Sequence, residues 1–332
     1  MRALVLHDGE MSLETRPTPV PGPGDVLVAV RAAGVNAADL LQRRGLYAAP
    51  DGWPPDVPGL EVAGVVDDVG EGVDPTLRGR RVCAVVGGGG HATHCLVPAE
   101  HLILVPDSVP WIEAGGFSEA FLTAHDALAG QAHLRANEHA LVSGAAGGVG
   151  AAAVQVARLL GANVTAVTRT PEHHSRLREI GATLAITSEE EPSLAPVDVV
   201  IELVGAAHLE GVQAILAPHA RVVVIGVGGG ARATIDLLRV MALRATLTGS
   251  TLRARSRDEK AEVTQRASAA LRAPWADRQL RVPVARTFDL ADAAAAYEYF
   301  ARPGKFGKVV LLVDDAATRG ATGHGFVDRT GD

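Results

Sequence analysis

The sequence predicts an α/β protein in which a barrel-like β domain surrounds a doubly wound parallel sheet. Three observations support this fold class. Short strand patterns separated by Pro and Gly fill roughly the first hundred residues, apolar strands alternate with helices between residues 139 and 249, and strand patterns return after residue 281. With 332 residues, the chain is long enough for two domains and a substantial core.

The amino-terminal part is expected to be rich in short strands. Many short strands with a turn signal every eight to twelve residues or so are typical of a barrel-like β domain. The strands are expected at 2–6, 26–31, 62–69, 81–86, 95–97 and 101–105, with a short helix at 38–44.

The pattern changes near Pro110, where a helix is expected at 113–128. The strands that follow are apolar without alternation, which indicates a parallel sheet covered on both faces. They are expected at 140–143, 163–167, 197–203, 221–226 and 245–249, with helices at 149–160, 172–180, 207–217 and 234–243. A helix at 258–271, a strand at 281–288, a helix at 291–300 and a strand at 308–313 complete the pattern.

The simplest domain organisation is a β domain that resumes after an inserted α/β domain. We expect residues 1–118 and 257–315 to form the β domain and residues 119–256 to form the inserted one. The tail at 316–332 has no periodicity and is predicted to be mobile.

Composition excludes several classes of protein. Hydrophobic residues make up 47% and charged residues 21% of the chain, the formal net charge is −7, and Lys and Arg form no block. This argues against nucleic-acid binding and against an anionic membrane surface. The longest uncharged run, 139–157, contains a glycine turn and is rejected as a membrane span. The amino-terminal apolar stretch is too short and is charged too early to be a signal peptide. The two cysteines allow no disulfide framework, so a cytoplasmic location is expected.

A glycine-rich turn, Ser-Gly-Ala-Ala-Gly-Gly-Val-Gly, fills residues 143–150 between a predicted strand and a predicted helix. This context is that of a dinucleotide-binding turn, whose backbone N–H groups hold a pyrophosphate at the helix start. Gly147 and Gly150 occupy the second and third glycine positions, and Ala145 replaces the first. The alternative is a βα turn that binds nothing. The expected cofactor contacts are Ala146, Gly147, Gly148, Val149 and Gly150.

The end of the next strand indicates which dinucleotide is bound. An acid about twenty residues after the glycines would bind a ribose 2′-hydroxyl. No acid occurs between Leu159 and Pro171, and Arg169 and Thr170 are present instead. Because an arginine suits a 2′-phosphate, NADPH is favoured over NADH. The alternative is that Arg169 simply points into water.

A metal site is not expected. The stretch His91-Ala-Thr-His-Cys95 invites a zinc interpretation, with Cys83 and Glu61 as further ligands. In a strand, however, His91 and His94 would diverge, and no CxxC or HExxH spacing is present.

Several separate segments together resemble the zinc-independent medium-chain dehydrogenase/reductase superfamily. The similarity is to its NADPH quinone oxidoreductase group, which includes the p53-inducible quinone-oxidoreductase-like proteins, and it covers residues 1 to about 313. The segments are Gly34–Tyr47, Pro58–Val66, Glu119–Ala124, Gly144–Gly150, Leu247–Arg255 and Gly304–Val310. The resemblance implies a GroES-like β-barrel domain split around a Rossmann domain. The cysteine, Gly-His-Glu motif and four-cysteine lobe of zinc-dependent relatives are missing, in agreement with the spacing argument.

The resemblance also implies roles for individual residues. Asn36 and Tyr47 match positions that face the nicotinamide and the substrate. The alternatives are that Asn36 only caps a helix and that Tyr47 only packs at a loop edge. The other matched positions, all near the cofactor, are Thr123, Gly226, Gly228 and Lys308. The sequence departs from the family at the 2′-phosphate contacts, where Arg169, Thr170 and His173 replace Gly, Ser and Lys. It also departs at Ser188, where a tyrosine is usual, and at Glu202, where the family has an aspartate.

The function expected from these features is NADPH-dependent, metal-independent hydride transfer to a quinone or another conjugated carbonyl such as an enone. One alternative is an enoyl-thioester or ketone reductase of a biosynthetic pathway. Another is an NADPH-binding protein with little turnover. Family members usually form homodimers through the edge of the Rossmann sheet, which predicts a dimer contact near residues 245–251.

Overall fold

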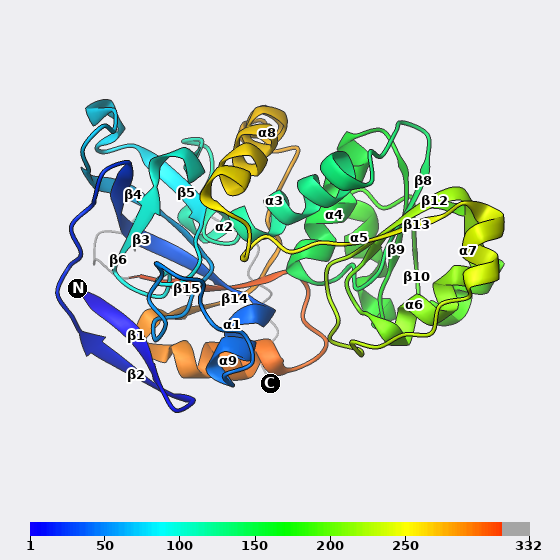
Figure 1. Ribbon diagram of the computed structural model, residues 1–332, viewed down its shortest axis with the longest axis horizontal. Helices are drawn as coiled ribbons and strands as arrows, with labels where there is room; N and C mark the ends of the chain where they lie inside the picture. Colours follow the sequence, from blue (N-terminus) through cyan, green and yellow to red (C-terminus); the bar gives the residue numbers. More distant parts are fainter. Residues whose placement is uncertain (314–332) are drawn as a thin grey trace.

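The computed structural model describes residues 1–313 and has two lobes side by side (Figure 1). The predicted mobile tail at 316–332 lies outside the described residues. One lobe holds the amino terminus and the other holds α7 at its far end. No helix in residues 1–313 is long and apolar enough to cross a membrane.

The first lobe is built on a seven-stranded sheet to which both ends of the described chain contribute. The sheet runs in the order β14-β15-β3-β4-β5-β7, with β6 also pairing with β3. Its strands are β3 (Asp25–Val35), β4 (Glu61–Val69), β5 (Arg81–Val85), β6 (His94–Pro98), β7 (Ile103–Leu104), β14 (Val284–Asp289) and β15 (Lys308–Leu312). A separate hairpin consists of β1 (Arg2–His7) and β2 (Glu10–Thr15). Because β15 pairs antiparallel with β3, the split GroES-like domain is confirmed.

The second lobe is a parallel six-stranded sheet in the order β10-β9-β8-β11-β12-β13. The strands are β8 (His139–Val142), β9 (Asn163–Val167), β10 (Leu184–Ile186), β11 (Val197–Glu202), β12 (Leu216–Val224) and β13 (Thr246–Gly249). Relative to the chain, this is the doubly wound order 3-2-1-4-5-6, in which ligands bind beyond the carboxyl ends of the central strands. The Rossmann-type fold is therefore confirmed, and β8 and β11 flank its switch point.

Helices cover the Rossmann sheet and connect the two lobes. Those of the Rossmann lobe are α4 (Gly148–Leu159), α5 (His174–Glu179), α6 (Ala206–Val212) and α7 (Leu237–Leu243). The others are α1 (Ala37–Arg43), α2 (Trp111–Ala114), α3 (Ser118–His125), α8 (Arg257–Ala276) and α9 (Ala293–Ala301). One apolar cluster joins α3 and α8 to α4 and the parallel sheet, and a second fills the GroES-like lobe.

Three elements differ from the sequence expectation. The strands β2 and β10 are not predicted by the sequence pattern, because β2 has no buried residue and β10 is only three residues long. The helix expected at 113–128 is broken into α2, α3 and a π-helical turn at Asp126–Gln131. The break falls at Gly115, where a Cβ would lie only 2.5 Å from the Cβ of Ala32, so the backbone there packs directly on β3. Tertiary contact overrides helix periodicity at this point.

Candidate active site

Lys308, the first residue of β15, connects the two lobes. The preceding Gly307 forms a bridge with Gly147 of the glycine turn and donates a 2.8 Å hydrogen bond to the carbonyl of Ala146. A Cβ on Gly148 would lie 2.4 Å from the Cδ of Lys308, so the lysine stem lies directly against the turn. The lysine is only 3% exposed.

The Lys308 ammonium reaches across to the GroES-like lobe. It donates to Oδ1 of Asn36 at 2.7 Å and to Oε1 of Glu61 at 2.5 Å. The Asn36 amide donates to the same Glu61 oxygen at 3.0 Å, and the backbone N–H of Glu119 donates to Glu61 Oε2 at 3.0 Å. We call Lys308, Asn36, Glu61 and Glu119 the interdomain cluster. It places Asn36 beside the glycine turn, although the two are far apart in the sequence.

Asn36 is the N-cap of α1 and takes part in a capping box with Asp39, as the capping alternative requires, and its side chain also contacts Lys308 and Glu61. Its second amide contact, to the carbonyl of Gly34, is long at 3.4 Å. Gly34 is required here, because a Cβ would lie 2.1 Å from Glu61 Oε1. The glycine therefore makes room for the buried carboxylate.

Two side chains of α3 face the same region. Burial, together with the neighbouring Glu61 carboxylate, raises the pKa of Glu119 to about 7, although Lys308 opposes the shift. The Glu119 carboxyl makes no hydrogen bond within residues 1–313. One helical turn later, the buried hydroxyl of Thr123 also has no hydrogen-bond partner in the described chain. An unpartnered buried hydroxyl calls for a ligand atom or water.

Tyr47 is held by Arg253. The guanidinium donates to the Tyr47 carbonyl at 3.0 Å and lies 4.8 Å from the centre of its ring. Arg253 also donates to Gln42 Oε1 at 2.6 Å and to the carbonyl of Gly87. The Tyr47 hydroxyl forms no hydrogen bond with any described residue. The backbone and ring are thus fixed, and the hydroxyl remains available.

The glycine turn has the geometry expected of a pyrophosphate site. Gly144 has a φ of 58°, and a Cβ on Gly150 would lie 2.4 Å from the Gly144 carbonyl oxygen. Gly147 is the N-cap of α4 and supplies no side-chain cap, so the first N–H groups of the helix stay free for an anion. Together with the unpartnered hydroxyl of Thr123, this turn fits a dinucleotide.

The three residues predicted near a 2′-phosphate differ in exposure. Arg169 is exposed, and the backbone N–H of Thr170 donates to Thr168 Oγ1 at 3.3 Å. His173 is only 9% exposed; its Nε2 hydrogen-bonds to the Gly304 carbonyl at 3.1 Å and its ring packs against Phe306. Arg169 therefore stays accessible to an anion, while one nitrogen of His173 is already engaged.

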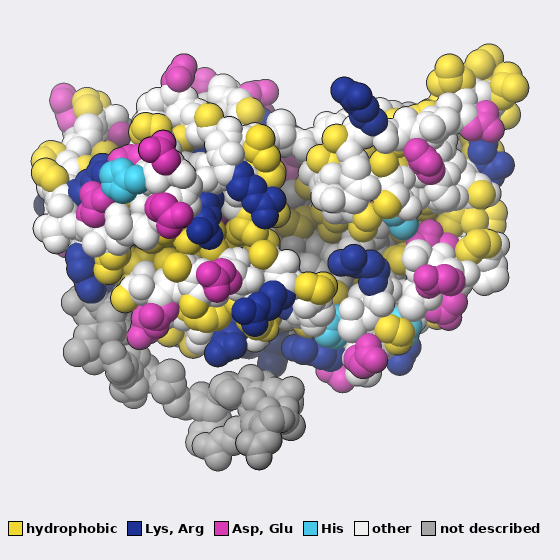
Figure 2. All heavy atoms as spheres, turned by 90° about the horizontal axis from the view of Figure 1, so that it is seen from below, with side chains coloured by type: hydrophobic (Ala, Val, Ile, Leu, Met, Phe, Trp, Pro, Cys, Tyr) yellow, Lys and Arg dark blue, Asp and Glu magenta, His cyan; other side chains and the backbone are white. Residues whose placement is uncertain are grey.

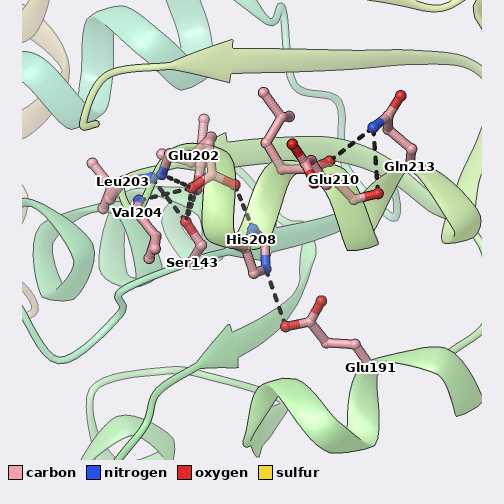
Figure 3. Close-up of polar contacts among 11 residues, drawn as sticks. Ser143, Glu191, Glu202, Leu203, Val204, His208, Glu210 and Gln213 are labelled. Carbon is pink, nitrogen blue, oxygen red and sulfur yellow. Dashed lines mark hydrogen bonds and ion pairs between the residues drawn. The ribbon is translucent and has the colours of Figure 1, made fainter. Parts of the chain in front are cut away.

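A second buried polar group lies within the Rossmann lobe, at the switch point (Figure 3). Glu202, the last residue of β11, accepts hydrogen bonds through Oε1 from Ser143 Oγ and the backbone N–H groups of Val204 and Gly205, at 2.7–2.9 Å. Its Oε2 bonds to Nδ1 of His208, whose Nε2 lies 3.0 Å from Glu191 Oε1. We call Ser143, Glu191, Glu202 and His208 the Rossmann cluster.

Charge pairing sets the protonation of this cluster. Burial alone would lower the pKa of His208, but hydrogen bonds to Glu191 and Glu202 outweigh it and raise the pKa to about 9. Burial likewise works against ionisation of Glu202, yet the bonds from His208 and the backbone hold its pKa below the ordinary value. The cluster is an ion pair at neutral pH.

The Rossmann cluster also supports the loop that contains Gly226 and Gly228. The Gly226 N–H donates to the carbonyl of Glu202 at 3.2 Å, and the Gly229 N–H donates to the carbonyl of Val204 at 2.7 Å. Gly226 is partly buried, whereas a Cβ on Gly228 would meet nothing within 4 Å. The loop therefore borders the carboxyl edge of the sheet, as its expected role requires.

The histidines considered as metal ligands have other partners. His91 is fully buried between the carbonyl of Gly34, 3.2 Å from Nε2, and the hydroxyl of Tyr297, 3.0 Å from Nδ1. Burial raises the thiol pKa of Cys83 and of Cys95 to about 12. Within residues 1–313, no group of three or more His, Cys, Asp or Glu side chains could hold a metal ion.

Fold and site together define a two-domain protein with a GroES-like domain, a Rossmann domain and a polar cluster between them. Two family models match the chain: the alcohol dehydrogenase GroES-like domain at residues 22–129 and the zinc-binding dehydrogenase at residues 148–269. The chain belongs to the medium-chain dehydrogenase/reductase superfamily, in its quinone oxidoreductase group.

Two curated relatives and one solved structure illustrate the similarity. Quinone oxidoreductase from Lama guanicoe is 30% identical, with 89% of this chain and 91% of that protein covered. The rat synaptic vesicle membrane protein VAT-1 homolog is 36% identical, but the match covers 68% of this chain and 59% of that protein. Among solved structures, the quinone oxidoreductase from Thermus thermophilus, also solved in complex with NADPH, has a TM-score of 0.83 and 35% identity over 94% of this chain and 100% of its own.

Sequence reasoning assigns no role to three residues of this region. Glu61 is considered as a metal ligand and as part of a family segment, and Glu119 and Arg253 are included only within family segments. A charged residue at the start of an apolar strand or inside an apolar helix is the available signal, because such a charge needs a buried partner. Its partner cannot be identified from the sequence.

Proposed function

We propose that the protein is an NADPH-dependent oxidoreductase that transfers hydride to a quinone or another conjugated carbonyl, such as an enone, without a metal ion. The observation that carries the proposal is the contact of Lys308 with both the glycine turn and Asn36. It joins the predicted pyrophosphate site to the predicted catalytic residue in one structure. The NADPH complex of the Thermus thermophilus relative and the quinone oxidoreductase relatives support the cofactor and the substrate class.

When bound, the reduced nicotinamide supplies the hydride. Two side chains of this chain can then stabilise the charge that develops on the carbonyl oxygen. The Tyr47 hydroxyl has no competing bond within the described chain, so it is the stronger candidate as donor. The Asn36 amide keeps one hydrogen on Glu61, and its long 3.4 Å contact with Gly34 leaves the other hydrogen accessible. Lys308 and Glu61 fix the orientation of this amide.

The space between the lobes suits this chemistry. Figure 2 shows the surface hollowed between them. Lys308, Asn36 and Glu61 are buried, and the low local dielectric constant strengthens each hydrogen bond to a developing charge.

The test is the steady-state reduction of a quinone by Tyr47→Phe and Asn36→Ala. Both variants are expected to lose at least about tenfold in kcat with little change in NADPH affinity, because one donor to the developing anion is removed. Tyr299→Phe is the matched control. The centre of the Tyr299 ring also lies 5.3 Å from an arginine guanidinium, that of Arg286, but in the GroES-like lobe and outside the interdomain cluster. Unchanged kinetics in both active-site variants would refute the assignment.

A panel of quinones, enones, enoyl thioesters and ketones decides between the proposed substrate class and a biosynthetic reductase. If NADPH binds and no acceptor oxidises it, the protein is a cofactor-binding protein instead. A cytoplasmic location stays a prediction.

We also infer a homodimer through the edge of the Rossmann sheet. β13 is the edge strand, and next to it Leu237, Leu238 and Met241 of α7 are 68–79% exposed. Figure 2 shows hydrophobic side chains gathered at this end of the molecule. An apolar edge of this kind needs a cover. Light scattering of the wild type should give twice the chain mass, and the Leu238→Glu variant should give the mass of a single chain. The control Val20→Glu, at an exposed residue in the other lobe, should keep the mass of the dimer.

A further inference from the structure

A cavity of about 570 Å³ opens in the GroES-like lobe, away from the glycine turn. It lies between the loop at 50–57, strand β6 with the turn that follows it, and the start of α8. Its volume is in the range of small-molecule sites. Much of its wall is apolar, formed by Pro50, Trp53, Pro54, Val57, Cys95 and Val97. None of the residues proposed for hydride transfer lines it.

Lys260 of α8 is a buried cation in this wall. It is 6% exposed, and its ammonium has neither a hydrogen bond nor an ion pair with any residue of the described chain. The Trp53 ring is its aromatic neighbour, with the ring centre 6.0 Å from Nζ. Burial lowers the pKa of Lys260, and the charge of Glu119 only partly opposes the shift.

The other charged groups near the cavity do not neutralise this lysine. Arg255 is paired with Asp126 at 2.6 Å, and Arg257 with Asp25 at 3.0 Å and with Glu100. The exposed Asp51 lines the cavity but forms no ion pair with Lys260 in the described structure.

A second polar atom in the same wall also lacks a partner. His101 is 2% exposed; its Nε2 bonds to the Arg257 carbonyl at 2.9 Å, while its buried Nδ1 has no hydrogen bond within residues 1–313. Buried polar groups without partners are unusual and costly in a folded protein. The two atoms differ in role: His101 Nδ1, whose ring donates through Nε2 to a carbonyl, is an acceptor for water or a hydroxyl, whereas the Lys260 ammonium, in the cavity wall, is the donor available to an anion.

The start of α8 narrows the chemistry of that ligand. Ser256 caps the helix and Glu259 closes the reciprocal bond to the Ser256 N–H, so these helix donors are already occupied. A phosphate needs several donors, and Lys260 is the one lysine or arginine side chain described in this wall that is not already in an ion pair, so an anion with a single charge is favoured. A single lysine beside a flat indole and two prolines suits one carboxylate on a planar apolar body.

We propose that this cavity binds a flat aromatic carboxylate, with the carboxylate on Lys260 and the ring against Trp53. The site is separate from that of hydride transfer. Arg253 stands between them, bonded to Gly87 on one side and to Tyr47 on the other, and a Cβ on Gly87 would lie 2.5 Å from the Trp53 ring. The ligand therefore binds whether or not NADPH is present.

The test is titration calorimetry of the full chain with 2-naphthoate, with and without saturating NADPH. We expect saturable binding in both conditions, and binding of the neutral 2-naphthamide at least about tenfold weaker, since a charge-assisted bond is lost. Lys260→Met should weaken naphthoate binding by a similar factor without lowering Tm, because an unpaired buried charge is removed. Arg266→Met, which removes one positive charge from an exposed position of the same helix, should bind as the wild type does.

Tryptophan fluorescence identifies the place of binding. Naphthoate should quench the wild type, and Trp53→Phe should lose that quenching although Trp111 and Trp275 remain. The proposal is overturned by the absence of binding, by equal binding of the amide, by wild-type affinity in Lys260→Met, or by displacement with NADPH.

Discussion

The interdomain cluster and the Rossmann cluster are built alike, but they differ in how completely their polar groups are hydrogen-bonded. Each centres on a fully buried glutamate at one end of a strand, Glu61 at the start of β4 and Glu202 at the end of β11. In the Rossmann cluster both nitrogens of His208 face carboxylates, and Glu202 Oε1 accepts three hydrogen bonds.

The interdomain cluster is incomplete by comparison. Next to it the buried Thr123 hydroxyl has no partner in the described chain, and the pKa of the partly exposed Glu119 carboxyl is raised to about 7. Saturated buried networks fix a structure, whereas unsatisfied groups with perturbed pKa values concentrate at functional sites. The comparison therefore supports the proposed chemistry at the interdomain cluster and a positioning role for the Rossmann cluster.

The largest effect is expected from Lys308→Met. It leaves the Glu61 carboxylate buried without its cation, and unfolding in urea should show a loss of about 3–5 kcal/mol. The double variant Lys308→Met/Glu61→Gln should recover most of that stability but not the turnover. Recovery of both would mean that the cluster only holds the lobes together.

His208→Gln should cost about 2–3 kcal/mol of stability, because charge-assisted bonds to two carboxylates are lost. In the wild type, the folded-state pKa of about 9 lies above the unfolded value of 6.5. The stabilisation by His208 is thus complete below pH 6.5 and is lost as the pH rises through 9. Urea titrations across this pH range should show that the free energy of unfolding of the variant depends less on pH than that of the wild type. The kcat of the variant at pH 7 should stay within about twofold of the wild-type value. A large fall in kcat would give this cluster a part in the chemistry.

Glu119→Gln should change the stability by a smaller amount and in the opposite direction, by stabilising the protein. The folded protein keeps the proton on Glu119 up to about pH 7, whereas the unfolded chain releases it near 4.5. Wild-type stability therefore falls as the pH rises through this window. At about pH 8 the variant should be more stable by on the order of 1–2 kcal/mol, and at about pH 4 the two should be equal. Equal stability at both pH values would show that Glu119 ionises normally.

Arg169→Ala tests a residue outside both clusters. Loss of one cation near a 2′-phosphate should weaken NADPH binding about tenfold and leave NADH binding unchanged, without a change in stability. Fluorescence titration with both cofactors measures this difference. Parallel weakening of NADH would remove Arg169 from the discrimination.

The sequence was sufficient for features that are local. Apolar strands in βαβ alternation predicted the parallel sheet, and β9 lies at the predicted residues 163–167. The glycine turn predicted its own conformation, because only residues without bulk allow the approach of Gly150 to Gly144. These features depend on neighbours close in the sequence.

Only the tertiary structure decided which charges meet. The contact of Lys308 with Glu61 joins residues 247 positions apart, and the bond from Lys308 to Asn36 spans 272. No periodicity or spacing encodes such a pair, because it forms only when β15 returns to pair with β3. The same holds for Lys260, whose isolation beside Trp53 depends on how α8 packs on the GroES-like lobe. The sequence determined the strands, the helices and the turn, and tertiary packing decided which buried charges are paired and which are left free to act.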